Sequence, residues 1–344
     1  MDCKESKLKD IISSQECKTL TEAIARSKNV VIVAHTAPDG DAIGSSLALG
    51  GVLKSLKKRV TLIMPDALPK SITFLKGAEE IKIYKNAVEE CNSIISFADT
   101  IFCLDFNESK RVDLMQDVLL SSSAYKVMID HHIYPSDFCD LVISYPEISS
   151  TSLLVYKILN QLNLTKYVDK SGAEAVYTGM MTDTGNFSYN SNDADIYVVI
   201  SELLQKGINK DEIYRIVCNT STLDKLRLNS YAISEKMEII SNKGVAIINL
   251  SRKELNHYSY QKGDTEGLVN VPLGIEGVNV SIFFREESGY VKVSLRSVGD
   301  YAVNTIASEL YNGGGHKNAA GGEFFGTMSD AVKIFKENIE NYIK

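Results

Sequence analysis

The chain has 344 residues, of which 44% are hydrophobic and 24% charged, which is typical of globular proteins and long enough for two domains. Its longest apolar runs have the length of a strand and the N-terminus carries no apolar leader, so we expect neither a membrane span nor secretion. The net charge is −7, and the one dense basic run lies at residues 54–59. Proteins that grip long nucleic acids cluster many basic residues, so a long polymer partner is disfavoured and a small anionic substrate is not.

Six cysteines are scattered along the chain without a Cys-x-x-Cys pair. In a chain of this length the pattern predicts reduced thiols, and it argues against both a disulfide framework and a thiol-rich zinc site. A cytoplasmic location is the expectation that follows.

The first part of the chain alternates short β-rich runs with helical patterns. The β-rich runs are residues 30–34, 60–64, 101–105 and 125–130. Apolar residues recur at helical spacing in residues 42–56, 109–120, 150–162, 171–181 and 195–204. This alternation predicts βαβ units, and hence an α/β domain with a mostly parallel sheet flanked by helices.

A polar, helical segment follows, and the pattern then changes. Strands are predicted at residues 245–250, 278–285 and 290–297, and helices at 301–309 and 330–342. These elements predict a smaller α+β domain. We therefore expect an N-terminal domain over residues 1–212, a helical connector over 213–241 and a C-terminal domain over 242–344.

The first group of chemically interesting residues follows the apolar run 30–34. A Pro and a Gly there predict a tight turn, which would aim His35, Asp39 and Asp41 at one point. Asp41 alone could be the N-cap of the following helix, because Asp is favoured at that position. That alternative leaves His35 and Asp39 unexplained.

Further polar residues close the later runs: Asp105 after one strand, and Asp130, His131 and His132 after another. Asp183 lies where a predicted helix meets a Gly-containing turn. Each aspartate could be an ordinary turn residue when it is considered alone. Together these residues fall on one rim of the predicted sheet, and ligands of open parallel sheets bind beyond the carboxyl ends of the strands.

Several carboxylates crowded at such a rim would repel one another unless cations neutralised them. Oxygen ligands with one or two imidazoles suit Mn²⁺ or Mg²⁺, and the imidazoles favour Mn²⁺. Two such ions can clamp a phosphoryl group and lower the pKa of a bridging water. The expected chemistry is therefore in-line hydrolysis of a phosphate ester.

The chain resembles the DHH phosphoesterase superfamily in five segments, which in order are HTAPDGDAIGS at 35–45, Asp105, DHH at 130–132, TDTG at 182–185 and GGGH at 313–316. The last segment is similar to the signature of the DHH-associated C-terminal domain, so the resemblance covers essentially the whole chain. The short two-domain architecture looks like the nanoRNase/pAp phosphatase (NrnA-like) branch. By this resemblance, residues 1–212 would be the metal-binding catalytic domain and residues 242–344 the substrate-binding domain.

The resemblance also implies roles for individual residues. One Mn²⁺ would be held by His35, Asp39 and Asp105. The second would be held by Asp41, Asp105, His131 and Asp183. Asp105 would bridge the two ions, His132 would face the scissile phosphate as electrophile or proton donor, and Asp130 would orient an imidazole through its ring N–H.

The Gly-rich segment gives a second candidate site. Consecutive glycines let a backbone approach an anion and present N–H groups to it, although a flexible surface loop is the alternative for three glycines alone. Arginines on the neighbouring predicted strands favour a phosphate and base pocket. Its expected members are Arg285, Arg296, Gly313, Gly314, Gly315 and His316. Arg111 could also reach the metal site, and a solvent-exposed salt bridge is its alternative.

The expected function is Mn²⁺-dependent hydrolysis of short RNA or DNA oligonucleotides to mononucleotides, with Mg²⁺ as the alternative ion. The resemblance implies substrates of about two to five nucleotides and phosphatase activity on 3′-phosphoadenosine 5′-phosphate (pAp), in keeping with the lack of a basic track for long strands. A phosphodiesterase of cyclic or linear dinucleotides and a non-catalytic nucleotide sensor are the alternatives. A homodimer is compatible with the sequence.

Overall fold

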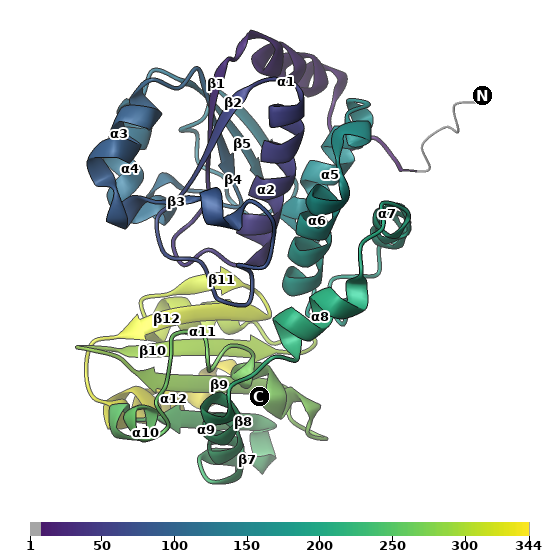
Figure 1. The fold of residues 1–344 in the computed structure, drawn as a ribbon. Coiled ribbons are helices and arrows are strands. Elements are labelled where there is room, and N and C mark those ends of the chain that lie inside the picture. Colours follow the sequence, from purple (N-terminus) through teal and green to yellow (C-terminus); the bar gives the residue numbers. More distant parts are fainter. Residues whose placement is uncertain (1–7, 344) are drawn as a thin grey trace. The chain divides into compact units, whose positions relative to one another are not determined.

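The computed structural model describes residues 8–343, and its contacts divide the chain into two compact units, Met1–Thr220 and Ser221–Lys344 (Figure 1). The predicted connector at 213–241 is shared between them: the helix α8 Lys210–Cys218 lies in the first unit, and α9 Leu223–Ser234 with the strand β7 Met237–Ile240 lies in the second. Within the described residues, no helix is both long and apolar enough to cross a membrane.

The first unit is built on a six-stranded sheet in which every neighbouring pair of strands is parallel. The order across the sheet is β3-β2-β1-β4-β5-β6. The strands are β1 Asn29–Val33, β2 Arg59–Met64, β3 Lys82–Ile83, β4 Thr100–Leu104, β5 Tyr125–Asp130 and β6 Leu141–Ser144. The predicted α/β class with a parallel sheet is confirmed.

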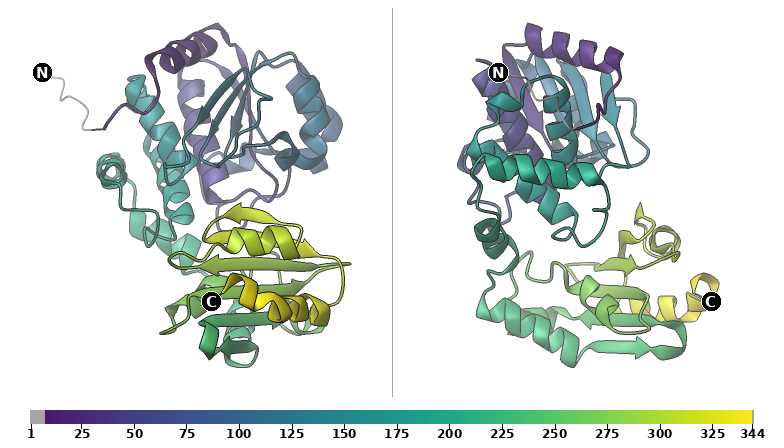
Figure 2. Two further views of the ribbon diagram at one scale, coloured as in Figure 1. Left: turned by 180° about the vertical axis from the view of Figure 1, so that it is seen from behind. Right: turned by 90° about the vertical axis from the view of Figure 1, so that its right-hand side faces the viewer.

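Helices cover both faces of this sheet (Figures 1 and 2). Side chains alternate along a strand, so Val30 and Ile32 of β1 enter one core while Val31 and Val33 enter the other. The helices over the first core are α1 Ser14–Arg26, α2 Gly40–Ser55, α5 Thr151–Gln161, α6 Lys170–Asp183 and α7 Ala194–Gln205. The helices over the second core are α3 Val88–Ser96 and α4 Gln116–Ser121.

The helix predicted over residues 109–120 is interrupted. The structure has a 3-10 helix, η3 Ser109–Met115, before α4 begins. Asp113 inside η3 has φ 51° and ψ −128°, a conformation that breaks the helical hydrogen-bond pattern. The strands β3 and β6 and the helices α1 and α3 are additions to the predicted elements; the remaining short 3-10 helices of this unit are η1 Ala78–Glu80, η2 Tyr84–Asn86 and η4 Thr165–Tyr167.

The second unit has a mixed six-stranded sheet of order β11-β12-β10-β9-β8-β7, in which only β8 and β9 pair in parallel. Besides β7, its strands are β8 Val245–Leu250, β9 Val280–Glu286, β10 Val291–Ser297, β11 Gly314–His316 and β12 Ala319–Phe324. One face packs on α11 Val303–Leu310 and α12 Met328–Tyr342. The other face packs on α9, α10 Arg252–His257 and the 3-10 helix η6 Leu268–Gly274, and η5 Ser241–Lys243 joins β7 to β8.

The Gly-rich segment is an edge strand, β11, paired with β12, and not a loop. Glycine is required at Gly313 because a Cβ there would lie 2.0 Å from the carbonyl oxygen of Gly321. Gly315 has φ 136°, which residues with a side chain rarely adopt. Gly313 and Gly315 therefore permit the close approach of the two strands, whereas a Cβ on Gly314 would meet no atom within 4 Å.

Candidate metal centre and active site

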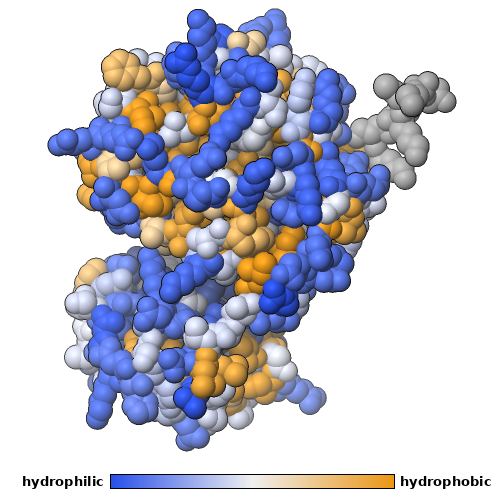
Figure 3. Space-filling model, viewed as in Figure 1, coloured by the Kyte–Doolittle hydropathy of each residue, from blue (hydrophilic) through white to orange (hydrophobic). Residues whose placement is uncertain are grey.

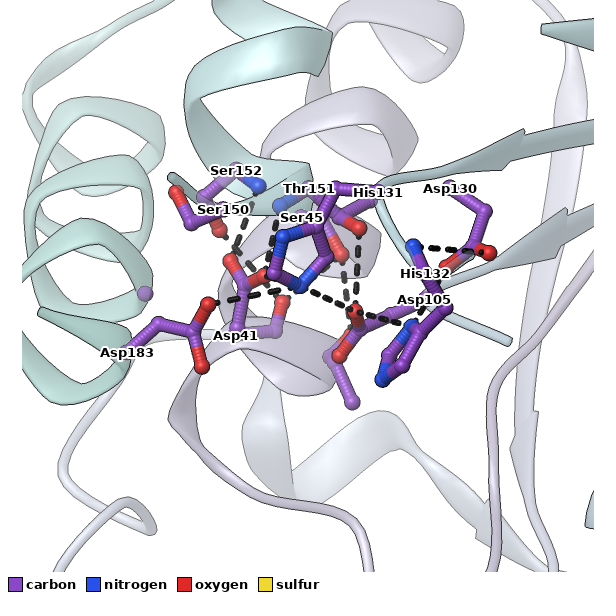
Figure 4. A network of polar contacts seen from close by, with 12 residues as sticks. Asp41, Ser45, Asp105, Asp130, His131, His132, Ser150, Thr151, Ser152 and Asp183 are labelled. Carbon is purple, nitrogen blue, oxygen red and sulfur yellow. Dashed lines mark hydrogen bonds and ion pairs between the residues drawn. The ribbon is translucent and has the colours of Figure 1, made fainter. Parts of the chain in front are cut away.

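The candidate site lies where three adjacent strands of the first unit end. His35 follows β1, Asp105 follows β4, and the Asp130–His132 segment lies at the carboxyl end of β5. Because β1 pairs with β4 and β4 with β5, these ends are neighbours, and Asp41 at the start of α2 and Asp183 at the end of α6 join them (Figure 4). The rim predicted from the sequence is therefore a real convergence of side chains.

Asp105 occupies the centre of the cluster. Its Oδ2 lies 3.4 Å from Nε2 of His35, and its Oδ1 lies 3.6 Å from Nε2 of His131. Nε2 of His35 is also 3.9 Å from Oδ2 of Asp39. On the other side, Nε2 of His131 lies 3.3 Å from Oδ2 of Asp183 and 4.0 Å from Oδ2 of Asp41.

Three groups of side chains in the described residues offer ligand atoms within 4.8 Å of one another. They are His35, Asp39 and Asp105; Asp41, His131 and Asp183; and Asp105, His131 and His132. The first two groups correspond to the two ligand sets expected from the sequence, apart from the bridging Asp105 in the second. Asp105 turns Oδ2 toward His35 of the first group and Oδ1 toward His131 of the second.

Asp39, and not Asp41, caps helix α2. Its Oδ1 accepts hydrogen bonds from the backbone N–H groups of Asp41 at 3.0 Å and Ala42 at 3.1 Å. The alternative that Asp41 is only an N-cap is therefore wrong. Asp41 lies in the first turn of the helix, 1% exposed, with its carboxylate directed at the cluster.

The N-terminus of α5 holds two of the carboxylates, a feature that the sequence interpretation missed. Both oxygens of Asp41 accept backbone hydrogen bonds, from Thr151 at 2.6 Å and Ser152 at 2.8 Å. The hydroxyl of Thr151 donates to Oδ1 of Asp105 at 2.9 Å (Figure 4). The signal was present as a run of small polar residues before an apolar helix, but Ser150 in that run is also an ordinary N-cap, bonded to Leu153 N–H.

Tight packing of α2 on α6 brings Asp183 to the site. A Cβ on Gly40 would lie 2.4 Å from the hydroxyl oxygen of Thr182, and a Cβ on Gly179 would lie 2.8 Å from Oδ1 of Asp41. The two helices can approach this closely only because both positions are glycine.

His132 and Asp130 form a separate pair at the edge of the cluster. Nδ1 of His132 donates to Oδ1 of Asp130 at 2.8 Å, and the backbone N–H of His132 donates to Oδ2 at 3.1 Å. Asp130 is fully buried, whereas 26% of the His132 side chain is exposed. The carboxylate therefore fixes the orientation of the His132 ring through Nδ1.

Backbone strain gathers at this rim. Asp105 has φ 63° and Ala37 has φ 49°, values that non-glycine residues rarely adopt. The strained Ala37 is held by a hydrogen bond of 2.8 Å from its N–H to Oδ2 of Asp66, which also binds Lys85 through Oδ1. The preceding N–H, of Thr36, donates to the carbonyl oxygen of Arg111. Such strain persists only where surrounding contacts impose it, and it is common at active sites.

The carboxylates of the cluster repel one another strongly. Burial raises the pKa of Asp41 to about 7, and the charge of Asp105 adds to that rise. Burial raises the pKa of Asp183 as well, with repulsion from Asp41 and Asp105 adding to it. Burial acts in the same direction on Asp105, but the hydrogen bond and charge of His35 and the charge of His131 outweigh it and hold the pKa of Asp105 well below its usual value.

The imidazoles compensate for this repulsion. Burial lowers the pKa of His35, but the hydrogen bond to Asp105 and the charge of Asp39 outweigh burial and raise it to about 9. A site that attracts positive charge so strongly suits cations, and buried carboxylate oxygens with imidazole nitrogens are donors that Mn²⁺ and Mg²⁺ accept. The residues present therefore fit divalent metal ions.

The predicted substrate-binding residues lie on the sheet of the second unit. Ala319 of β12 pairs with His316 of β11 on one side and with Arg296 of β10 on the other, so all three side chains share one face. Arg285 pairs instead with Lys292, four residue pairs away from Arg296 along β10. The structure thus brings His316 and Arg296 together but not Arg285.

Arg285 already has partners within the second unit. Its guanidinium donates to Glu287 at 2.8 Å and to Thr265 at 2.8 Å, and it lies 5.2 Å from the ring centroid of Tyr260. In the first unit, the side chain of Arg111 is exposed, and its carbonyl oxygen accepts a hydrogen bond from the N–H of Thr36, next to His35.

Two family models match the chain, the N-terminal domain of the DHH family over residues 29–180 and the DHHA1 domain over residues 232–344. The chain is 30% identical over 303 residues to the bifunctional oligoribonuclease and PAP phosphatase NrnA of Thermus thermophilus, covering 88% of this chain and 86% of the relative. It is 25% identical over 319 residues to the NrnA of Bacillus subtilis, covering 92% and 96% of the two chains. The crystal structure of an exopolyphosphatase-related protein from Bacteroides fragilis is 48% identical, with a TM-score of 0.95 over 97% of this chain and 98% of that one.

The fold and the site define a phosphoesterase. The chain belongs to the DHH family and carries the DHHA1 domain as its second unit, and its full-length relatives include bifunctional NrnA proteins. The resemblance inferred from five short segments is confirmed.

Proposed function

We propose that this protein hydrolyses short oligonucleotides, of about two to five nucleotides, to mononucleotides and removes a phosphate from pAp, using two Mn²⁺ ions with Mg²⁺ as the alternative. The observation that carries the proposal is the position of Asp105, whose two oxygens face His35 and His131 on opposite sides. The NrnA relatives, which bear both activities in their names, support the substrate class.

In this mechanism the first unit supplies the catalytic groups. His35, Asp39 and Asp105 would hold one ion, and Asp41, Asp105, His131 and Asp183 the other. When bound, the ions would supply the positive charge that polarises the phosphate and lowers the pKa of the attacking water. Asp130 keeps the His132 ring oriented through Nδ1, so that Nε2 can donate a hydrogen bond or a proton to the phosphate oxygens during bond breaking.

The second unit would bind the rest of the substrate. Arg296 carries a guanidinium suited to forked phosphate contacts and to stacking on a base, and His316 shares its face of the sheet. Arg285 would contribute to substrate binding only indirectly, because its guanidinium already donates hydrogen bonds to Glu287 and Thr265. This refines the expectation that Arg285, Arg296 and the Gly-rich segment form one pocket.

The net charge of −7 supports a short substrate, since strands of many phosphates are normally gripped by clustered basic residues. The test is an assay of the purified chain with Mn²⁺ on a diadenosine dinucleotide, a pentanucleotide, a long single strand, pAp and a cyclic dinucleotide. We expect mononucleotide from the two short linear substrates and phosphate from pAp. Equal rates on the dinucleotide and the long strand would contradict the proposed length preference, and a preference for the cyclic dinucleotide would favour the alternative phosphodiesterase.

A non-catalytic nucleotide sensor would be expected to lack at least one metal ligand. All six expected ligands are present in the sequence, and the structure gathers them within the three groups described above. Binding of the dinucleotide without any release of mononucleotide would nevertheless favour the sensor.

A further inference from the structure

Tyr134 is the most exposed large side chain near the metal ligands, with 82% of its surface exposed. Among the large hydrophobic side chains of the described residues, none has a higher exposed fraction. Tyr134 lies two residues after His132, so no more than about 7 Å of extended chain separate their Cα atoms. An aromatic ring is therefore presented to solvent within one short turn of the residue proposed to meet the scissile phosphate.

The backbone of Tyr134 is strained. Its φ is 59°, in the left-handed region where a bulky residue is a genuine outlier. Packing of the ring does not compensate for that strain, because most of the ring is in solvent. Strain of this kind persists where surrounding contacts impose it, and its location beside catalytic groups points to a role in function.

Contacts on both sides of Tyr134 impose the conformation. The side-chain amide of Asn107 donates to the carbonyl oxygen of Ile133 at 2.7 Å. The carbonyl oxygen of Asn107 accepts from the N–H of Ser136 at 2.8 Å and from its hydroxyl at 2.9 Å. Asn107 follows Asp105 by two residues. The segment after this proposed metal ligand therefore holds the turn that follows His132 in place through hydrogen bonds.

Exposure alone does not distinguish Tyr134. Large hydrophobic side chains are exposed at scattered positions, and the face in Figure 3 mixes hydrophilic with hydrophobic areas. Phe97, for example, is 77% exposed, but it has an ordinary φ of −95°. It precedes the amino end of β4, whereas His35, Asp105 and His132 follow the carboxyl ends of strands. Tyr134 differs in its strained, clamped backbone and in its location.

We propose that Tyr134 is a platform on which one nucleobase of the substrate stacks while the adjoining phosphate lies at His132. This inference rests on the proposed function. Each natural base has a π face, so stacking on an aromatic ring tolerates all four bases and selects nucleotides over plain sugar phosphates. Tyr134 would thus set the substrate class of the metal centre without reading sequence.

The absence of tryptophan from the chain permits a direct binding test. Tyr134→Trp places a single tryptophan at the proposed platform, and Phe97→Trp places one at a matched exposed position. We expect AMP to quench the fluorescence of Tyr134→Trp saturably in the Mn²⁺-loaded protein, and ribose 5-phosphate, which lacks only the base, to leave it unchanged. Phe97→Trp should respond to neither ligand. Equal responses of Tyr134→Trp to both ligands, or no response to AMP, would overturn the proposal.

A kinetic test separates this inference from the proposed function. Tyr134→Ala should raise KM for a dinucleotide with two adenine bases about 5- to 140-fold, which corresponds to the loss of one base–aromatic stack, while Tyr134→Phe keeps the wild-type KM. Two abasic control substrates are the same dinucleotide with either its first or its second base removed. On the control that lacks the stacked base, the wild type and Tyr134→Ala should have the same KM. A Tyr134→Ala enzyme with wild-type KM on the intact dinucleotide overturns the stacking role alone. A wild-type protein that cleaves no dinucleotide overturns the proposed function as well.

Discussion

The hydroxyl of Thr151 donates a 2.9 Å hydrogen bond to Oδ1 of Asp105, the same oxygen that faces His131. Thr151 also donates its backbone N–H to Asp41. One residue at the start of α5 thus contacts two proposed metal ligands that come from different strands and helices. Its hydroxyl limits the orientations that the central carboxylate can take.

Thr151→Val should therefore weaken the site while preserving the fold, because valine keeps the shape and the backbone N–H but removes the hydroxyl. We expect a loss of about 10- to 100-fold in Mn²⁺ affinity or in kcat/KM, which is typical when a group that orients a metal ligand is removed. Thr178→Val is the control, since Thr178 is equally buried but donates its hydroxyl to the carbonyl oxygen of Glu174. Equal losses in the two variants would show that the hydroxyl of Thr151 has no special role.

Removal of metal should abolish activity and lower stability together. The cluster carboxylates repel one another when no cation neutralises them, so Mn²⁺ should raise the Tm of the wild-type protein. At 100 times Kd, each occupied site should add about 2.7 kcal/mol to the free energy of unfolding. Asp105→Asn should lose both the activity and the Mn²⁺-dependent rise in Tm, and asparagine tolerates the positive φ at this position. Full activity of the wild type in a chelating buffer would refute the two-metal mechanism.

Arg296 and His132 should affect different kinetic constants. Arg296 lies on the sheet of the second unit, so Arg296→Ala should raise KM on a dinucleotide with unchanged Mn²⁺ affinity, at a cost of about 1.5 to 3 kcal/mol for one charge-assisted contact. His132→Ala should lower kcat with little change in KM, because its Nε2 is proposed to act during bond breaking. Steady-state kinetics of both variants on the same dinucleotide decide the matter. Normal KM in Arg296→Ala would remove Arg296 from the substrate site.

Glu254 should make the second unit sensitive to acid. Burial raises the pKa of its carboxyl, but hydrogen bonds from Lys236, Ser251 and Tyr231 outweigh burial and lower the pKa to about 2, from the ordinary value of 4.5 for a glutamate. A folded-state pKa below the unfolded value stabilises the protein above about pH 4.5, and this contribution is lost as the pH falls from there towards 2.

Denaturant unfolding at pH 6 and pH 3, in chelating buffer, should measure this contribution. The difference in stability between wild type and Glu254→Gln should shrink by on the order of 1 to 2 kcal/mol at the lower pH, once solvent screening is allowed for. A difference that stays constant over this range would mean that the Glu254 carboxylate contributes no pH-dependent stability.

Much of the fold and site could be predicted because the informative residues follow the strands directly. The runs ending near Ala34, Leu104 and Asp130 are strongly apolar, and parallel strands place their carboxyl ends together. The polar residues after them therefore had to converge, and no knowledge of side-chain packing was needed to expect it.

The contacts around the ligands could not be predicted in the same way. Thr151 and Ser152 resemble ordinary residues at a helix start, and only the packing of α5 against the cluster shows that they bind carboxylates. Asp66 and Asn107 support the rim through bonds to residues 26 or more positions away in sequence. Positive φ at Asp105 and Tyr134 depends on those same distant contacts, so local propensity gives no sign of it.

The left-handed backbone conformation of Asp105 lowers the stability of the fold, although its carboxylate is central to the proposed activity. Asp105 adopts φ 63°, which costs free energy for any residue with a side chain, so its backbone conformation opposes folding. Selection for a stable chain alone would replace it with glycine, which accepts that φ freely. Continued selection for hydrolysis is what would retain an aspartate there. In a lineage released from that selection, a change to glycine at position 105 would relieve the backbone strain and remove the central carboxylate of the rim.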